Sequence, residues 1–197
     1  MFLHEIMKGA DPSHLAFTGE VDITYGALED AIHRYRNAIY ALGVREGERV
    51  SLYSANRAEF VYAFMAVVSL GAIIVPVNNS LVDREVDYIL KDSGSTLLIT
   101  DTPMDVSVPS ISIEELDEKS REPLPEAPDF PASLTEDDVC ALIYTSGTTG
   151  SPKGAMLTHK NLVRNVEQFT ARIIFKPEDK VLCVLPMFHC YGMTTIV

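Results

Sequence analysis

Apolar positions in the first hundred residues follow two alternating patterns. Between Thr24 and Gly43 they recur every three or four residues, which predicts an amphipathic helix with Thr24 as its N-cap. Short apolar runs rich in β-branched residues then alternate with further helical patterns. The sequence predicts strands at 49–54, 72–77 and 96–100, and helices at 58–70 and 83–92. This order is typical of an α/β fold, a mostly parallel sheet with helices on both faces.

One uncharged segment, Phe60 to Val82, is long enough to raise the question of a transmembrane helix. Gly71 and Pro76 interrupt it, and the residues after Gly71 change to β-branched types. A helix, a turn and a buried strand explain this pattern better than one long helix. We therefore expect no integral membrane segment.

The periodic pattern stops between Glu114 and Asp138. This segment holds ten acidic residues, two basic residues and four prolines, a composition that predicts an extended, solvated connection. It divides the chain into an N-terminal α/β portion (1–113), an acidic Pro-rich linker (114–138) and the start of a second α/β portion (139–197). In the last portion we expect a strand at 139–144, a helix from 158 to about 171 and a strand at 181–185.

The charge balance limits the function classes. The chain has 16 Lys and Arg against 28 Asp and Glu, a formal net charge of -12, so nonspecific attraction to nucleic acid or to an anionic membrane is not expected. The three cysteines are an odd number flanked by apolar residues, and no basic apolar leader opens the sequence. These features favour a reducing, cytoplasmic location.

The segment 144–154, YTSGTTGSPKG, has the composition of an anion-binding loop. Its three glycines permit backbone N–H groups to converge, four hydroxyls add donors, and Lys153 adds a positive charge. Polyphosphate is the natural ligand for such a loop. A flexible Gly/Ser turn is the alternative, but a turn does not require four hydroxyls and a lysine directly after a buried strand. The spacing matches neither a Walker loop nor a dinucleotide-binding loop.

Together with Met156–His159, this loop resembles the phosphate-binding signature of the adenylate-forming superfamily, which includes acyl-CoA synthetases, luciferase-like enzymes and the adenylation domains of peptide synthetases. Segments 24–25, 43–50 and 64–78 resemble the family's N-terminal segments, in the family's order. Segment 185–193, LPMFHCYGM, resembles the aromatic-His motif that lines the acyl pocket. The resemblance covers nearly the whole chain and implies an incomplete N-terminal portion of the large domain of an adenylate-forming enzyme.

The resemblance also implies a reaction in which ATP activates a carboxylate as an acyl-adenylate and coenzyme A then displaces AMP. A Mg²⁺ ion would be carried by the ATP phosphates. By resemblance, the phosphate-contacting residues are Thr145, Ser146, Gly147, Thr148, Thr149, Gly150 and Lys153, with Lys153 also a catalytic candidate. The apolar motif favours a fatty acid. The alternatives are an aryl-CoA ligase, an amino-acid adenylation fragment, and a non-catalytic module that binds a nucleotide or a partner.

His189 is the second catalytic candidate, since the matching motif places it between Phe188 and Tyr191, with Gly192 leaving room beside it. It would orient the substrate carboxylate or shape the pocket wall, and all four residues are expected to line the substrate pocket. Spacing alone would equally fit a packed histidine at a turn. We expect His159 to be either a solvated first-turn residue or functional, and three other histidines to be unpaired at the surface: His4, His14 and His33. No cluster has metal-ligand spacing.

The family's parts that hold adenine, ribose, the magnesium-contacting glutamate and the adenylation lysine all lie beyond the aromatic-His motif, and this sequence contains none of them. It ends in an apolar segment, 194–197. We therefore expect an N-terminal piece of an acyl-CoA synthetase that is inactive alone. The surface left by the absent half offers a site for self-association.

Overall fold

A mostly parallel sheet forms the centre of the computed structural model, which describes residues 1–197 except Glu20, 146–151, Ile174, 177–178 and Val197. Among the described residues its strand order is β6-β5-β3-β4-β7-β8, and only β7 and β8 pair antiparallel. The strands are β3 (Arg49–Tyr53), β4 (Ile73–Val77), β5 (Ser95–Thr100), β6 (Ser110–Ser112), β7 (Val139–Thr145) and β8 (Lys153–Thr158). A separate antiparallel pair comprises β1 (Leu15–Phe17) and β2 (Ile23–Thr24).

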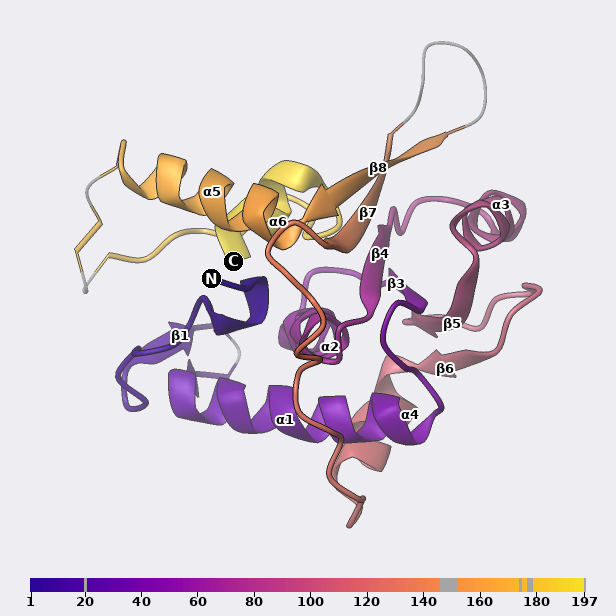
Figure 1. Cartoon of the computed structure of the whole chain (residues 1–197), viewed down its shortest axis with the longest axis horizontal. Coiled ribbons are helices and arrows are strands. Elements are labelled where there is room, and N and C mark those ends of the chain that lie inside the picture. The colour runs from indigo at the N-terminus through magenta and orange to yellow at the C-terminus, as the bar shows by residue number, and fades with distance from the viewer. Residues whose placement is uncertain (20, 146–151, 174, 177–178, 197) are drawn as a thin grey trace.

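Helices cover both faces of this sheet, as the sequence predicted. Figure 1 shows α2 against one face with α1 packed outside it, and α3 on the opposite face. The helical elements are η1 (Leu3–Glu5), α1 (Tyr25–Ala41), α2 (Ala58–Ser69), α3 (Asp83–Ser93), α4 (Ile113–Ser120), α5 (His159–Thr170) and α6 (Cys190–Ile196). The predicted α/β class is confirmed, and α1, α2 and α3 fall within two residues of their expected bounds.

The ends of α1 show why the local sequence predicts its bounds. The Thr24 hydroxyl accepts a hydrogen bond from the Ala27 N–H, and this satisfies one of the free donors of the first turn. The apolar face then buries Leu28, Tyr35 and Ile39. Gly43 follows with a φ of +100°, a conformation that side chains with a Cβ rarely adopt, and the helix ends before it.

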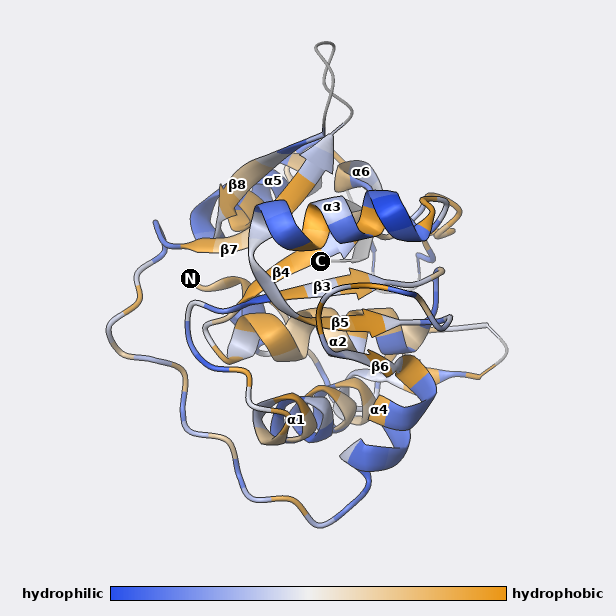
Figure 2. Cartoon of the chain, turned by 90° about the vertical axis from the view of Figure 1, so that its right-hand side faces the viewer, coloured by the Kyte–Doolittle hydropathy of each residue, from blue (hydrophilic) through white to orange (hydrophobic). Residues whose placement is uncertain are grey.

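The core has two parts, one on each side of the sheet. Ile74 packs in the cluster on the α2 side, whereas Val75 and Val77 pack against α3. All three side chains have 0% exposure, which explains why β4 reads as a continuous apolar run rather than an alternating one. Figure 2 shows these apolar strands lying behind α3. No helix in the described parts of the chain is long and apolar enough to cross a membrane.

The expectation of an extended connection over 114–138 is wrong at its start, where α4 forms. Ser112 caps this helix, with its hydroxyl accepting from the Glu115 N–H at 3.1 Å, and Ile113 and Leu116 are fully buried. The acidic residues of α4 therefore belong to an amphipathic helix. The remaining residues, 121–138, form no helix or strand; we call them the strap.

The strap is bound to the body of the molecule rather than solvated along its length. Asn37 Oδ1 accepts from the Ala127 N–H at 3.0 Å, and Arg36 Nη1 donates to the Ala127 carbonyl at 3.2 Å. The Phe130 ring packs against the His4 ring, with the ring centroids 4.3 Å apart. The strap leads directly into β7, which pairs with β4 in the sheet.

The predicted strand at 181–185 is absent, because no strand among the described residues lies beside this segment to pair with it. Three of its side chains are largely exposed, Val181 by 57%, Leu182 by 82% and Val184 by 69%, whereas Cys183 is half-buried against the core. Conversely, β8 was not predicted, since most of its side chains face solvent and give no apolar pattern.

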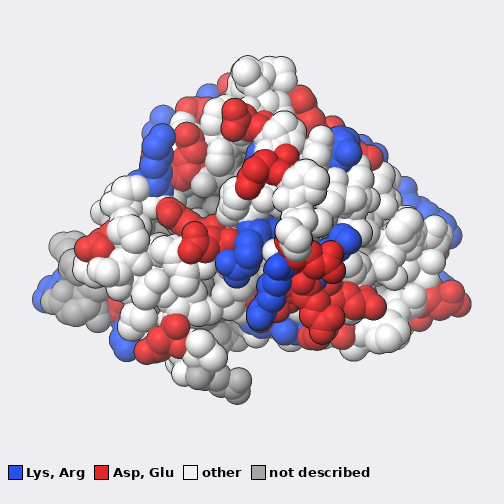
Figure 3. All heavy atoms as spheres, turned by 90° about the horizontal axis from the view of Figure 1, so that it is seen from below, with Lys and Arg blue, Asp and Glu red and all other residues white. Residues whose placement is uncertain are grey.

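Charged side chains of both signs lie next to one another on the face seen in Figure 3. Two ion pairs involve α4: Arg121, just after the helix, donates to Asp117 at 2.7 Å, and Arg57 donates to Glu114 at 2.7 Å. Exposed pairs of this kind contribute little stability, about 0–1 kcal/mol each. The prediction that the chain does not bind nucleic acid remains a prediction.

Candidate functional site

The β7–β8 hairpin frames the predicted phosphate loop. Thr145 and Lys153 face each other as the last paired residues of the two strands, and both are exposed. Pairing in the sheet therefore holds Thr145 and Lys153, the residues on either side of the predicted loop, next to each other. Five of the residues assigned to phosphate contact lie outside the described residues, so their roles stay predictions: Ser146, Gly147, Thr148, Thr149 and Gly150.

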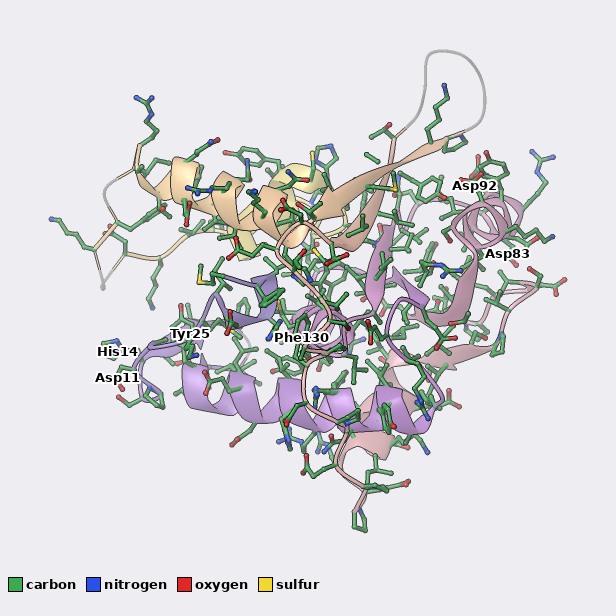
Figure 4. The ribbon with its side chains drawn as sticks, viewed as in Figure 1. Asp11, His14, Tyr25, Asp83, Asp92 and Phe130 are labelled. Carbon is green, nitrogen blue, oxygen red and sulfur yellow. The ribbon has the colours of Figure 1, made fainter. Side chains whose placement is uncertain are left out.

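Tyr144 holds the base of this hairpin against α3. Its hydroxyl donates to Asp92 Oδ2 at 2.6 Å, and Figure 4 shows Asp92 on α3. Burial, followed by this hydrogen bond to the carboxylate, raises the pKa of Tyr144, so the phenol stays protonated and keeps donating. The ring also lies against Gly154, where an added Cβ would come within 3.1 Å of Cε2. No local pattern points to Asp92, because the contact joins residues 52 positions apart in the chain.

The second motif runs from Leu185 into α6. Met187 is buried, Phe188 is half-buried, and His189 and Tyr191 are exposed. The His189 N–H donates to the Pro186 carbonyl at 3.0 Å, and this closes the turn before the helix. His189 Nδ1 accepts from the Tyr191 N–H at 3.3 Å, so in the neutral ring the proton is on Nε2.

At position 192 only glycine fits beside the neighbouring backbone. It is buried, and an added Cβ would collide with the Pro186 carbonyl. The room predicted beside His189 is therefore filled by the chain's own backbone. Gly192 and Tyr191 do not line the cavity described next.

One cavity of about 290 Å³ brings the two motifs together at the carboxyl ends of β4 and β7. Thr145 of the loop motif and Phe188 and His189 of the second motif all line it. The remaining lining residues are Pro76, Asn78, Leu81, Ile89, Ile143, Tyr144, Pro152 and Cys190. A mostly apolar wall with a few polar groups at a carboxyl strand edge is typical of small-molecule sites in α/β folds. Lys153 is beside this cavity in the hairpin but is not part of its wall.

Asn56, which the sequence reasoning missed, contacts the second motif from the end of β3. Its Nδ2 donates to the Leu185 carbonyl at 2.8 Å, and its Oδ1 accepts from the Met187 N–H at 2.8 Å. The two residues are separated from Asn56 by about 130 positions, so only the folded structure could reveal this contact.

The expectations for the other histidines are mostly wrong. His159 is 1% exposed: its Nδ1 accepts from the Leu3 N–H at 3.2 Å and its ring packs edge-on to Phe2. Burial lowers the pKa of His159 to about 4. His33 Nε2 lies 2.9 Å from Glu126 Oε2, and His14 Nε2 lies 3.7 Å from Asp11 Oδ2, so both histidines have a carboxylate partner. His159 is thus a packed residue that joins the N-terminus to α5.

In the described part of the chain, no group of three or more His, Cys, Asp or Glu side chains is placed to hold a metal ion.

Comparison with known proteins identifies the fold's family. The model of the AMP-binding enzyme family matches residues 7–197. The chain belongs to this family. Feruloyl-CoA synthase of Amycolatopsis sp is 36% identical over 183 residues, which is 89% of this chain and 36% of that protein. The long-chain-fatty-acid–CoA ligase FadD13 of Mycobacterium tuberculosis is 33% identical over 193 residues, 90% of this chain and 38% of that protein.

Solved structures agree with this assignment. O-succinylbenzoate coenzyme A synthetase (MenE) from Bacillus subtilis in complex with AMP superposes with a TM-score of 0.86 at 31% identity, over 95% of this chain and 50% of that one. The same enzyme in complex with ATP and a magnesium ion gives 0.84 at 29% identity, over 95% of this chain and 51% of that one. The chain thus has the fold of the N-terminal part of an adenylate-forming CoA ligase, and spans little more than a third of its curated relatives' length.

Proposed function

We propose that this chain provides the phosphate loop and part of the acyl-binding wall of an ATP-dependent, AMP-forming acid–thiol ligase. The supporting observation is the shared cavity: Thr145, at the start of the loop, and His189, in the aromatic motif, line the same space. The ligase would work on a carboxylate, ATP and coenzyme A, and the parts that complete the site would come from a longer protein.

In the first half-reaction, a carboxylate oxygen attacks the α-phosphorus of ATP and the bond to pyrophosphate breaks. The carboxylate is already ionised at neutral pH, so no general base is needed. The loop donors and Lys153 would hold the negative charge of the leaving pyrophosphate, an electrostatic role. Magnesium bound to the phosphates would neutralise further charge. In the second half-reaction the coenzyme A thiol displaces AMP and forms the thioester.

The substrate we propose first is a fatty acid. Ile89, Leu81, Ile143 and Phe188 give the cavity an apolar wall that suits an alkyl chain. An aryl acid is the alternative within the same reaction, since relatives of similar identity include both a feruloyl-CoA synthase and a long-chain-fatty-acid ligase.

Carboxylate-dependent exchange of pyrophosphate into ATP tests the first half-reaction. We expect exchange from a longer protein that continues this chain to the length of its relatives, strongest with fatty acids. We expect none from the 197-residue chain alone. Exchange by the chain alone would show that it is a complete adenylating unit, and its absence from the longer protein with every acid would contradict the proposed function.

A non-catalytic nucleotide-binding module is the alternative from another class. A loop without its adenine pocket should bind ATP only weakly, so calorimetric titration of the folded 197-residue chain separates the two proposals. Micromolar binding, about -8 kcal/mol, would favour the module.

A further inference from the structure

The Asn56 side chain forms a clamp on the segment that carries His189. One amide group contacts the backbone on both sides of Pro186: its N–H donates to the Leu185 carbonyl and its oxygen accepts from the Met187 N–H, each at 2.8 Å. A side-chain amide in this arrangement replaces the pair of hydrogen bonds that a neighbouring strand would make. No strand among the described residues pairs with the segment before Pro186. At Leu185 and Met187, the Asn56 amide supplies hydrogen bonds of the kind that a neighbouring strand would make.

The clamp itself is held at a fixed position. Asp101, just after β5, accepts from the Ala55 N–H through Oδ2 at 2.6 Å. On the other side of Asn56, the Arg57 guanidinium donates to Glu59 at 2.8 Å and to Glu114 at 2.7 Å, and lies 3.6 Å from Asp101. Backbone and side-chain contacts on both flanks therefore restrict where the amide can point.

The clamped segment leads directly to the cavity. Met187 is 5% exposed and packs in the core, and the turn from Pro186 then places Phe188 and His189 in the cavity wall. A shift of the backbone at Leu185 or Met187 would move the His189 ring, because only a short turn separates them. Asn56 itself is exposed and does not line the cavity.

We infer that Asn56 is a positioning residue for acid binding: it fixes the segment 185–187 and thereby the place of His189 and Phe188 in the cavity wall. This inference rests on the proposed function. Because Asn56 acts on the acyl wall and not on the phosphate loop, its loss should affect the carboxylate and spare ATP.

Asn56→Ala in the longer ligase tests this inference by pyrophosphate exchange. We expect the KM for the acid to rise about tenfold, as a displaced binding group would cause, with the KM for ATP changed less than about twofold. Asn37→Ala is the matched control, since Asn37 also accepts from a backbone N–H, at Ala127, away from the cavity. It should lower stability but leave both KM values within about twofold.

A double-mutant cycle separates positioning from general structural loss. If Asn56 acts through His189, Asn56→Ala combined with His189→Ala should raise the acid KM no further than His189→Ala alone. Equal changes in the acid and ATP KM values, or additive effects in the double variant, would overturn the inference. Asn56→Asp keeps the acceptor for Met187 but loses the donor for Leu185, so an intermediate acid KM is expected; an acid KM equal to wild type would contradict the clamp.

Amide exchange measured by mass spectrometry on peptides covering 180–193 gives a readout that is independent of activity. Asn56→Ala should speed exchange in these peptides, and Asn37→Ala should not. If the unmodified ligase shows no acid-dependent exchange of pyrophosphate, the proposed function fails while this measurement still decides the clamp. Unchanged amide exchange in Asn56→Ala would overturn it.

Discussion

Two apolar segments of this chain have nearly the same pattern and opposite environments. The first, β4, is IIVPV, and the second, 181–185, is VLCVL. In β4 the side chains of Ile74, Val75 and Val77 are fully buried between helices, whereas Leu182 is 82% exposed. β4 has β3 and β7 as neighbours, and 181–185 has no neighbouring strand in the described structure. An apolar run therefore becomes a strand only where other backbone groups are available to pair with it.

The largest expected effect comes from matched truncations in these two segments. Ile74→Ala should lower the free energy of unfolding by about 2–5 kcal/mol, because it leaves a cavity in the core. Leu182→Ala should change it by less than about 0.5 kcal/mol. Urea denaturation of both variants measures the difference, and equal losses would mean that 181–185 is packed.

A functional contrast uses the exposed cation of the hairpin. Lys153→Ala in the longer ligase should slow pyrophosphate exchange about 10²- to 10³-fold, because a charge that stabilises the leaving group is lost. Since the side chain is exposed, stability should hardly change. Lys160→Ala is the control. Lys160 lies on α5, outside the cavity, and its Nζ is 3.0 Å from Asp137 Oδ1. A similar loss in both variants would argue against a specific role for Lys153.

The same comparison shows what the sequence could and could not predict. The helix caps at Thr24 and Gly43 and the buried run of β4 are local signals, and the elements they predicted are confirmed. The strand at 181–185 was wrong, because its pattern is local but strand formation depends on distant neighbours. For the site, Thr145, Phe188 and His189 came from motifs and do line one cavity. Asn56 and Asp92 could not be found, because their contacts join residues far apart in the chain.

Acid should lower the free energy of unfolding through the buried His159, between about pH 6.5 and 4. Burial lowers the pKa of His159 to about 4, so the folded state favours the neutral ring. The free energy of unfolding therefore keeps its full value above the unfolded-state pKa of about 6.5. It falls as pH drops toward 4, by up to about 3 kcal/mol, because the unfolded chain takes up the proton first. His4, which faces it, has its pKa lowered by burial as well and acts in the same direction.

His159→Gln should remove most of this slope between pH 6.5 and 5, measured as unfolding free energy against pH. His33→Gln is the control, because His33 is exposed beside Glu126. A slope unchanged by His159→Gln would show that other groups cause it.

The smallest expected effect concerns association. We propose that the exposed side chains at 181–185 let the 197-residue chain self-associate at high concentration. Leu182→Asp should weaken that association about tenfold in light-scattering titrations, and Val21→Asp, at another exposed apolar residue (71%), should not. A monomer at every concentration would contradict the proposal.

If the loop and the aromatic motif serve one site, an acid panel in the pyrophosphate exchange assay will separate their roles. In the longer ligase, Lys153→Ala should lower exchange by the same factor for every acid, whereas His189→Ala should change the ranking of short, long and aryl acids. An unchanged ranking in His189→Ala, with unchanged rates, would show that the aromatic motif is packing and that the two motifs do not share a site.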